Sequence, residues 1–213
     1  TVQLVETIRV EIAPVVDELK DIPPMTIRED TATHLNLNLA SLIGDTSLLP
    51  SKGVETVTAI HFLANPNGGS LSGPTGLLVS DGAGGYTLTD VSRINEVVYT
   101  PPFNKHGDFT IPLDITVTDT TIGLTLTPNS VSSTITTSIG VTVERVTDFA
   151  VLHASDLLGA EDSDIKLTGL TAELFDRDGS EAMTVSLNGV PAGAVILIDR
   201  GGSLVQAANN GSS

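Results

Sequence analysis

The alternation of apolar and polar residues is the feature that most constrains how this chain can fold. The clearest case runs from Ile111 to Thr118, where Ile, Leu, Ile and Val occupy every second position. Successive side chains of a β-strand point to opposite faces, so a period of two is typical of a half-buried strand. The same pattern predicts strands over residues 54–63, 122–127 and 135–143, and shorter ones over 35–39 and 183–187.

Turn residues separate these apolar runs. Clusters of Asn, Asp, Gly and Pro occupy residues 65–69, 81–85 and 188–189, and such clusters favour turns. The helical pattern of residues 15–20 is short and runs into Pro23-Pro24, which cannot continue a helix. Strands at a spacing of about 8–12 residues with turns between them predict an all-β fold, an antiparallel β-sandwich.

Composition excludes several classes of protein. The 213 residues include 10 basic and 26 acidic ones, for a net charge of −16, which opposes binding to the phosphates of a nucleic acid. A hydrophobic fraction of 40% is enough to build a core. No run approaches the roughly 18 apolar residues of a membrane span. The absence of cysteine excludes disulfides and thiolate metal sites.

Self-comparison indicates an internal repeat. Three motifs recur in the same order and at nearly equal offsets: Val10-Glu11-Ile12 matches Val141-Thr142-Val143, Glu29-Asp30 matches Glu161-Asp162, and Gly53-x-Glu55 matches Gly179-x-Glu181. Ordered matches at similar spacing are typical of tandem repeats. We therefore expect residues 1–14 to be the last strand of a preceding repeat, 15–147 a complete repeat, and 148–213 the first half of a further repeat.

Two stretches carry a resemblance to a known family. Residues 176–181 read Asp-Arg-Asp-Gly-Ser-Glu and residues 189–194 read Gly-Val-Pro-Ala-Gly-Ala. The run Tyr99-Thr100-Pro101-Pro102-Phe103-Asn104, followed by residues 107–111 and by Val117-Thr118-Asp119, continues the pattern. These motifs resemble the immunoglobulin-like and cadherin-like tandem repeats that form the extender of large bacterial surface adhesins, both repeats-in-toxin and biofilm-associated.

The resemblance implies a structural, non-enzymatic module in the extracellular space, on the surface of a Gram-negative bacterium, supporting cell adhesion and biofilm formation. Its partners would be the neighbouring repeats of the same chain, and its cofactor would be Ca²⁺. Two alternatives remain open from the sequence. One is a ligand-binding module that holds a sugar, a peptide or a ligand of a host or biofilm surface. The other is an accessory sandwich domain of a secreted hydrolase.

Clustered carboxylates are the candidate metal ligands, because Ca²⁺ takes six to eight oxygen ligands. A tight turn at Gly179 can bring Asp176, Asp178 and Glu181 around one centre. A second cluster, near the repeat junction, combines Glu161, Asp162 and Asp164 with Asp119 or Asp148, and Glu29 and Asp30 hold the matching place in the first repeat. The competing interpretation is that these residues only form solvated turns. The loop over residues 45–55 lacks the middle carboxylate and contains Lys52, which disfavours calcium there.

No motif indicates catalysis. The four histidines lie far apart in the sequence, and no Gly-x-Ser-x-Gly motif occurs, so neither a zinc site nor a hydrolase nucleophile is expected.

An incomplete second repeat would leave an unpaired strand edge, which invites pairing with another chain. Strand exchange between copies, donated from residues 1–14, is therefore a hypothesis.

Overall fold

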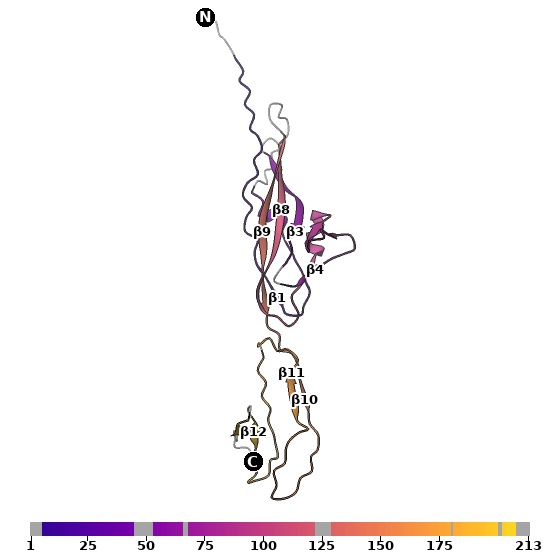
Figure 1. Cartoon of the computed structure of the whole chain (residues 1–213). Coiled ribbons are helices and arrows are strands. Elements are labelled where there is room, and N and C mark those ends of the chain that lie inside the picture. Colours follow the sequence, from indigo (N-terminus) through magenta and orange to yellow (C-terminus); the bar gives the residue numbers. More distant parts are fainter. Residues whose placement is uncertain are drawn as a thin grey trace. The chain divides into compact units, whose positions relative to one another are not determined.

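The computed structural model describes residues 6–44, 53–65, 68–121, 129–179, 181–199 and 202–207. The chain divides into two compact units, Thr1–Thr147 and Asp148–Ser213. Strands dominate the regular structure of the described residues (Figure 1), so the predicted all-β class is confirmed. Figure 1 labels the main elements.

The described residues of the first unit form two sheets. A six-stranded sheet has the order β1-β9-β8-β3-β6-β5, and a three-stranded sheet has the order β2-β7-β4. The elements are β1 (Met25–Arg28), β2 (Thr33–His34), α1 (Leu39–Leu42), β3 (Val54–Phe62), β4 (Ser70–Ser72), β5 (Leu78–Ser80), β6 (Tyr86–Leu88), the 3₁₀-helix η2 (Val91–Glu96), β7 (Val98–Thr100), β8 (Gly107–Thr120) and β9 (Ser130–Glu144).

The antiparallel ladder of β8 and β9 is the longest strand pairing described in this unit (Figure 1). It runs without a register shift from Gly107 opposite Val143 to Thr120 opposite Ser130. β8 also pairs with β3. The strands predicted over 54–63, 111–118 and 135–143 are confirmed as β3, β8 and β9. β1 pairs with β9 in parallel, whereas the other pairs of the sheet are antiparallel.

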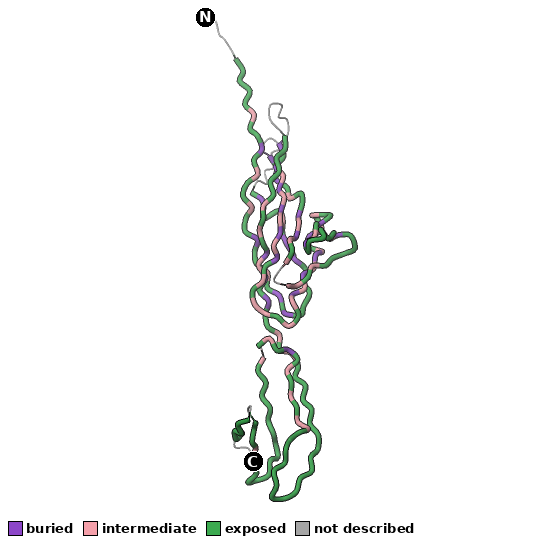
Figure 2. The backbone as a smooth tube through the Cα atoms, viewed as in Figure 1, coloured by how far each residue is buried: buried purple, intermediate pink, exposed green. Residues whose placement is uncertain are grey.

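Both sheets contribute to one apolar core. Ile60 and Phe62 of β3, Leu113 of β8 and Tyr99 of β7 are fully buried and belong to a single cluster of contacting residues. Figure 2 shows the buried positions gathered in this unit. Each strand therefore turns one face inward, as the alternation of its sequence requires.

Two short strand predictions are wrong. Leu35 and Leu37 are buried as the alternation predicted, but Asn36 has a left-handed φ of 49°, which breaks an extended strand. Residues 183–187 form no strand, because they have no sheet partner among the described residues. The strand predicted over residues 122–127 lies outside the described residues.

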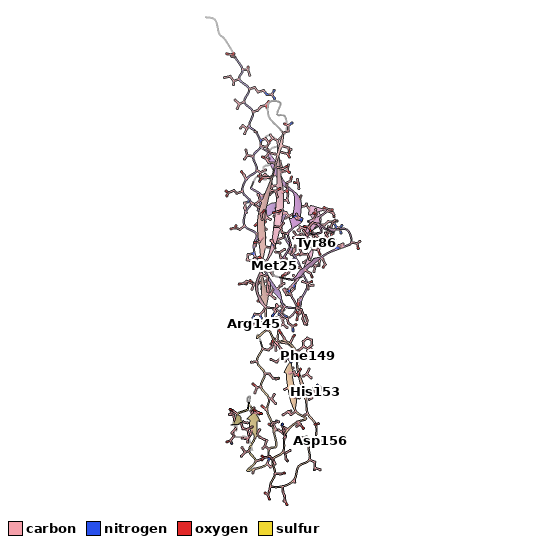
Figure 3. All side chains as sticks on the ribbon, in the orientation of Figure 1. Met25, Tyr86, Arg145, Phe149, His153 and Asp156 are labelled. Atoms are coloured by element: carbon pink, nitrogen blue, oxygen red, sulfur yellow. The ribbon has the colours of Figure 1, made fainter. Side chains whose placement is uncertain are left out.

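The second unit contains two short ladders among its described residues. β10 (Ala150–His153) pairs with β11 (Thr171–Leu174), and β12 (Leu197–Asp199) pairs with β13 (Leu204–Gln206). The ring of Phe149, labelled in Figure 3, stacks on Phe175 with 4.9 Å between centroids. No apolar side chain is buried among the described residues of this unit, which is drawn almost entirely as exposed in Figure 2.

Candidate metal centre

Two acidic side chains face each other inside the first unit. Glu55 of β3 is paired with Asp119 of β8 across the ladder, and both are almost fully buried, with 3% and 5% of their surface exposed. Directly opposed residues of antiparallel strands have Cβ atoms about 4.5–5.5 Å apart, and like charges in such a pair are destabilising. A buried pair of this kind therefore favours the binding of a cation.

A β-bulge places Glu55 on the inner face. The register of β3 against β8 shifts between Val57 and Ala59, so one extra residue moves all earlier side chains to the opposite face. Ile60 and Phe62 are buried after the bulge, and Glu55 is buried before it. The sequence pattern missed Glu55 as a ligand because strict alternation with Ile60 and Phe62 would place it outside. Its only signal was the repeat match of Gly53-x-Glu55 to Gly179-x-Glu181.

Backbone amides hold the two carboxylates. Glu55 Oε1 accepts a hydrogen bond from the Asp17 N–H at 2.6 Å, and Oε2 accepts one from the Gly44 N–H at 3.0 Å. Asp119 Oδ2 accepts one from the Val15 N–H at 2.9 Å. These bonds fasten the segment around residues 15–17 to the ends of β3 and β8. The site thus connects segments that lie far apart in the sequence.

One oxygen of the pair has no hydrogen-bond partner among the described residues. Asp119 Oδ1 is buried and accepts no hydrogen bond from any described residue, although a buried polar atom without a partner is costly. Gly53, with φ of 86°, lies beside it, and a Cβ at Gly53 would come within 2.7 Å of Oδ1. The Asp17 carboxylate lies close by, with Oδ2 3.0 Å from where a Cβ of Gly44 would be. Carboxylate oxygens are the ligands that Ca²⁺ prefers, so the Glu55–Asp119 pair is a candidate site, although Asp17, Glu55 and Asp119 do not bring three carboxylate oxygens within 4.8 Å of one another.

A second group of oxygens lies around Glu29 and Asp30, both predicted as ligands. Glu29 is 3% exposed. Its Oε1 accepts a hydrogen bond from the Val146 N–H at 2.5 Å, and its Oε2 is buried without a partner among the described residues. Asp30 accepts a hydrogen bond from the Asn104 N–H at 2.9 Å, and the Oδ1 of Asn104 is also buried without a partner among them. Among the described residues of the first unit, buried acidic oxygens without a hydrogen-bond partner therefore occur both at Asp119 and at Glu29.

Among the three predicted loop ligands of the second unit, Asp176 and Glu181 have carboxylate oxygens within 4.8 Å of each other. Asp176 is buried, and its Oδ1 accepts a hydrogen bond from the Asp178 N–H at 2.9 Å. Its Oδ2 has no partner among the described residues. Gly179 makes the predicted turn with a φ of 96°, and Glu181 follows it, half-buried. Metal binding by Asp176, Asp178 and Glu181 stays a prediction.

The predicted junction cluster is open to solvent. Glu161, Asp162 and Asp164 are exposed, and their carboxylates form no hydrogen bond or ion pair with another described residue. Asp148 is half-buried. Asp119, predicted to act with this cluster, has Glu55 as its cross-strand neighbour instead. A ligand set built on Glu161, Asp162 and Asp164 therefore stays a prediction.

A small cavity of about 280 Å³ opens elsewhere on the first unit. It lies between Pro23-Pro24, which lead into β1, and the segment that follows β2. Leu35 and Leu42 form part of its apolar wall, and Met25, labelled in Figure 3, also lines it. Prolines have no N–H to pair with a neighbouring strand, so the gap follows from the local sequence. No acidic residue is among the described residues that line it.

Among the described residues, no helix is long and apolar enough to cross a membrane.

Comparison with known protein families, with curated proteins and with solved structures found no match. The candidate ligands are therefore chosen from their burial, their strand pairing and their buried oxygens alone.

Proposed function

We propose that this chain is a non-enzymatic extender module of a bacterial cell-surface adhesin, built from immunoglobulin-like repeats that Ca²⁺ makes rigid. The observation that carries the proposal is the buried Glu55–Asp119 pair, whose Asp119 Oδ1 has no hydrogen-bond partner in the described part of the chain. A bound cation would remove the repulsion between the carboxylates and complete the coordination of that oxygen. It would also strengthen the attachment of residues 15–17 to the unit.

The order of the strands supports the immunoglobulin-like assignment. In such sandwiches one sheet contains strands C, F and G, and the other contains B, E and D. The adjacent strands β9, β8 and β3 correspond to G, F and C, and the sheet β2-β7-β4 corresponds to B, E and D. The parallel pairing of β1 with β9 then places the first strand beside the last. β5 and β6 extend the first sheet beyond C.

Local geometry supports the tandem repeat. The Lys20 N–H donates to the Leu42 carbonyl in the first unit. The offset that relates Val10 to Val141 also relates Lys20 to Val151 and Leu42 to Glu173. Val151 and Glu173 are strand partners in the second unit.

Backbone angles at the matched positions agree as well. The left-handed φ of Asp30, 54°, recurs at Asp162, 58°. Gly53 and Gly179, which the sequence matched, have φ of 86° and 96°. Equivalent backbone geometry at equivalent positions is expected of copies of one fold.

We assign the calcium ligands in order of the support they have. Glu55 and Asp119 come first, with Asp17 beside them, and Glu29 and Asp30 form a second set in the first unit. Asp176, Asp178 and Glu181 form the loop set of the second unit. The proposed location is extracellular, on the bacterial surface, where the module would space a distal ligand-binding domain from the cell. Extracellular calcium-binding modules typically have Kd values of about 10⁻⁴–10⁻³ M.

Thermal unfolding of the full chain in millimolar Ca²⁺ and in excess chelator tests the proposal. A ligand that binds only the folded state adds about 2.7 kcal/mol at a hundredfold excess over Kd. For a domain of this size that corresponds to a rise in Tm of roughly 5–10 °C. We expect Asp119→Asn to lose most of this rise, and to melt no lower than the native sequence in chelator because the substitution relieves repulsion.

Asp114→Asn is the matched control. Asp114 lies in the same strand, on the outer face, and accepts a hydrogen bond from the Thr136 hydroxyl, which an asparagine oxygen can also accept. We expect it to keep the full calcium response. Identical melting of the native chain in calcium and in chelator would show that the carboxylates serve only to fasten backbone amides, and would refute the calcium assignment.

A further inference from the structure

The cavity of the first unit is bordered by one edge of each of its two sheets. Among the described strands, β1 is outermost at one side of the six-stranded sheet, and β2 is outermost at one side of the three-stranded sheet. Thr26 of β1 and His34 of β2 both line the cavity. Edge strands present main-chain N–H and C=O groups on the side that has no partner strand, so the cavity lies beside polar groups of two strands.

The cavity combines a buried apolar base with an exposed polar rim. Leu35, Leu37, Leu42 and Ile139 line it and are buried in the core of the unit. The polar side chains of the lining are exposed or half-buried, and they are Thr26, Thr33, His34, Asn36, Asn38 and Ser41. Sites for small molecules have this composition, in which a few polar groups fix the orientation of a ligand on an apolar surface.

Two asparagines place amide groups at this rim. Asn38 is the N-cap residue of α1, but its side chain makes no capping hydrogen bond, which is the usual role of asparagine at this position. Asn36 is exposed and has a left-handed φ of 49°, a conformation that in residues other than glycine is concentrated at functional sites. Each amide has two donor hydrogens and an acceptor oxygen, and can therefore bind hydroxyl groups in either sense.

The charge of the lining indicates a neutral ligand. The described lining residues include no Asp, Glu, Lys or Arg, so they provide no carboxylate for a cation and no guanidinium or ammonium group for an anion. The net charge of −16 on the chain further repels anions. The hydroxyls, amides and imidazole of the lining all form hydrogen bonds with neutral hydroxyl groups.

We propose that this cavity binds the terminal neutral sugar residue of a glycan. A sugar ring presents hydroxyls at its edge, which Asn36 and Asn38 can bind, and C–H groups on its face, which pack on the buried leucines. The cavity volume of about 280 Å³ lies near the lower end of the range for small-molecule sites, as a single ring requires. The inference goes beyond the extender role and is independent of calcium, because no carboxylate takes part.

The methionine methyl groups report on binding to the full chain. The chain has two methionines; Met25 lines the cavity, and Met183 belongs to the second unit. Methyl glycosides of glucose, galactose, mannose and N-acetylglucosamine are titrated separately and followed by NMR. We expect at least one to shift the Met25 methyl resonance with a Kd of about 1–10 mM and to leave Met183 unchanged. Absence of a shift at Met25 with all four glycosides overturns the proposal, as do equal shifts at both methionines.

Substitution of the two asparagines tests the rim. Asn36→Gly removes the amide and keeps the backbone, because glycine adopts a left-handed φ readily. We expect it to raise the Kd for the glycoside by about tenfold, and Asn38→Ala to do the same. Asn104→Gly is the matched control, since Asn104 has the same φ of 49° and is not among the lining residues, and it should bind like the native chain. Native affinity in both rim variants, or an equal loss in Asn104→Gly, overturns the proposal.

Cyclohexanol separates recognition of a sugar from filling of an apolar space. Its ring has the size of a pyranose ring but carries a single hydroxyl, so it can use the apolar base and little of the rim. We expect its Kd, measured from the Met25 methyl resonance, to exceed that of the glycoside by about tenfold or more. Binding of cyclohexanol as tight as that of the glycoside would assign the cavity to apolar ligands and overturn the proposal.

Discussion

Asp81 organises the turn between β5 and β6 through its carboxylate. Oδ1 accepts hydrogen bonds from the Ala83 N–H at 2.7 Å and the Gly85 N–H at 2.9 Å. Oδ2 lies 3.0 Å from His61 Nε2. The hydrogen bond from Ala83 is the largest cause that lowers the pKa of Asp81, with Gly85 and His61 adding to it against partial desolvation. A single side chain thus replaces several backbone contacts in closing the turn.

This pKa predicts how the turn responds to acid. A carboxyl whose pKa is lowered by folding contributes stability above its unfolded value of about 3.9, and loses it as the pH falls through the folded value. We expect the amide resonances of Ala83 and Gly85 to move together below that pH, where the carboxylate becomes protonated. Asp81→Asn should abolish the transition, whereas Asp108→Asn, exposed on β8, should preserve it. Amide shifts that titrate equally in Asp81→Asn would contradict the assignment.

At the scale of elements, β8 shows how much of the fold follows from one strand. Its odd-numbered residues from Ile111 to Val117 point into the core, and its even-numbered residues are at least partly exposed. The outer face carries hydroxyls that bond across strands, such as Thr116 to Thr134 at 2.9 Å. Because β8 lies between β3 and β9, its inner face is the centre of the sheet.

Substitutions on the two faces of β8 should differ accordingly. Ile111 is fully buried and its neighbour Thr110 is exposed. We expect Ile111→Ala to lower the free energy of unfolding by about 2–5 kcal/mol through lost burial and a cavity. Thr110→Ala, on the outer face, should change it by less than about 1 kcal/mol. Urea unfolding followed by circular dichroism measures both, and equal effects would mean that the inner face is not packed as described.

At the scale of the whole molecule, the two units differ in the apolar packing that stabilises each of them. The first unit has a continuous apolar core that both of its sheets line. The described residues of the second unit contain two short ladders and no buried apolar side chain. Cooperative stability comes mainly from apolar burial, so we expect the units to open with very different free energies.

Limited proteolysis at low protein concentration checks this difference. We expect trypsin to cut after Lys166 and Arg177 well before Arg93, because local opening limits cleavage in a folded segment. Mass spectrometry should then find a persistent fragment that contains β1 to β9 of the first unit. Cleavage at Arg93 as early as at Lys166 would show that the first unit lacks the stability its core implies.

The alternation of residues was enough to predict the all-β class and the strands of the central ladder. It predicted which positions of β8 and β9 are inward, because the side-chain period of a strand is a local property of the backbone. The acidic turn at Asp176 and Asp178 was also predictable, since its residues are neighbours in the sequence. The repeat pattern likewise located Glu29 and Asp30, although not the buried oxygens that lack partners there.

Only the tertiary structure decided which carboxylates meet. Glu55 is buried because a bulge in β3 changes the face of every earlier residue, and Asp119 faces it because β3 pairs with β8. Asn36, with its left-handed φ, interrupts the alternating segment between Leu35 and Leu37. Bulges and strand partners depend on contacts between residues far apart in the chain, which a local period does not contain. The sequence by itself therefore determined the faces of β8 and β9, and long-range pairing determined the face of Glu55 and with it the site.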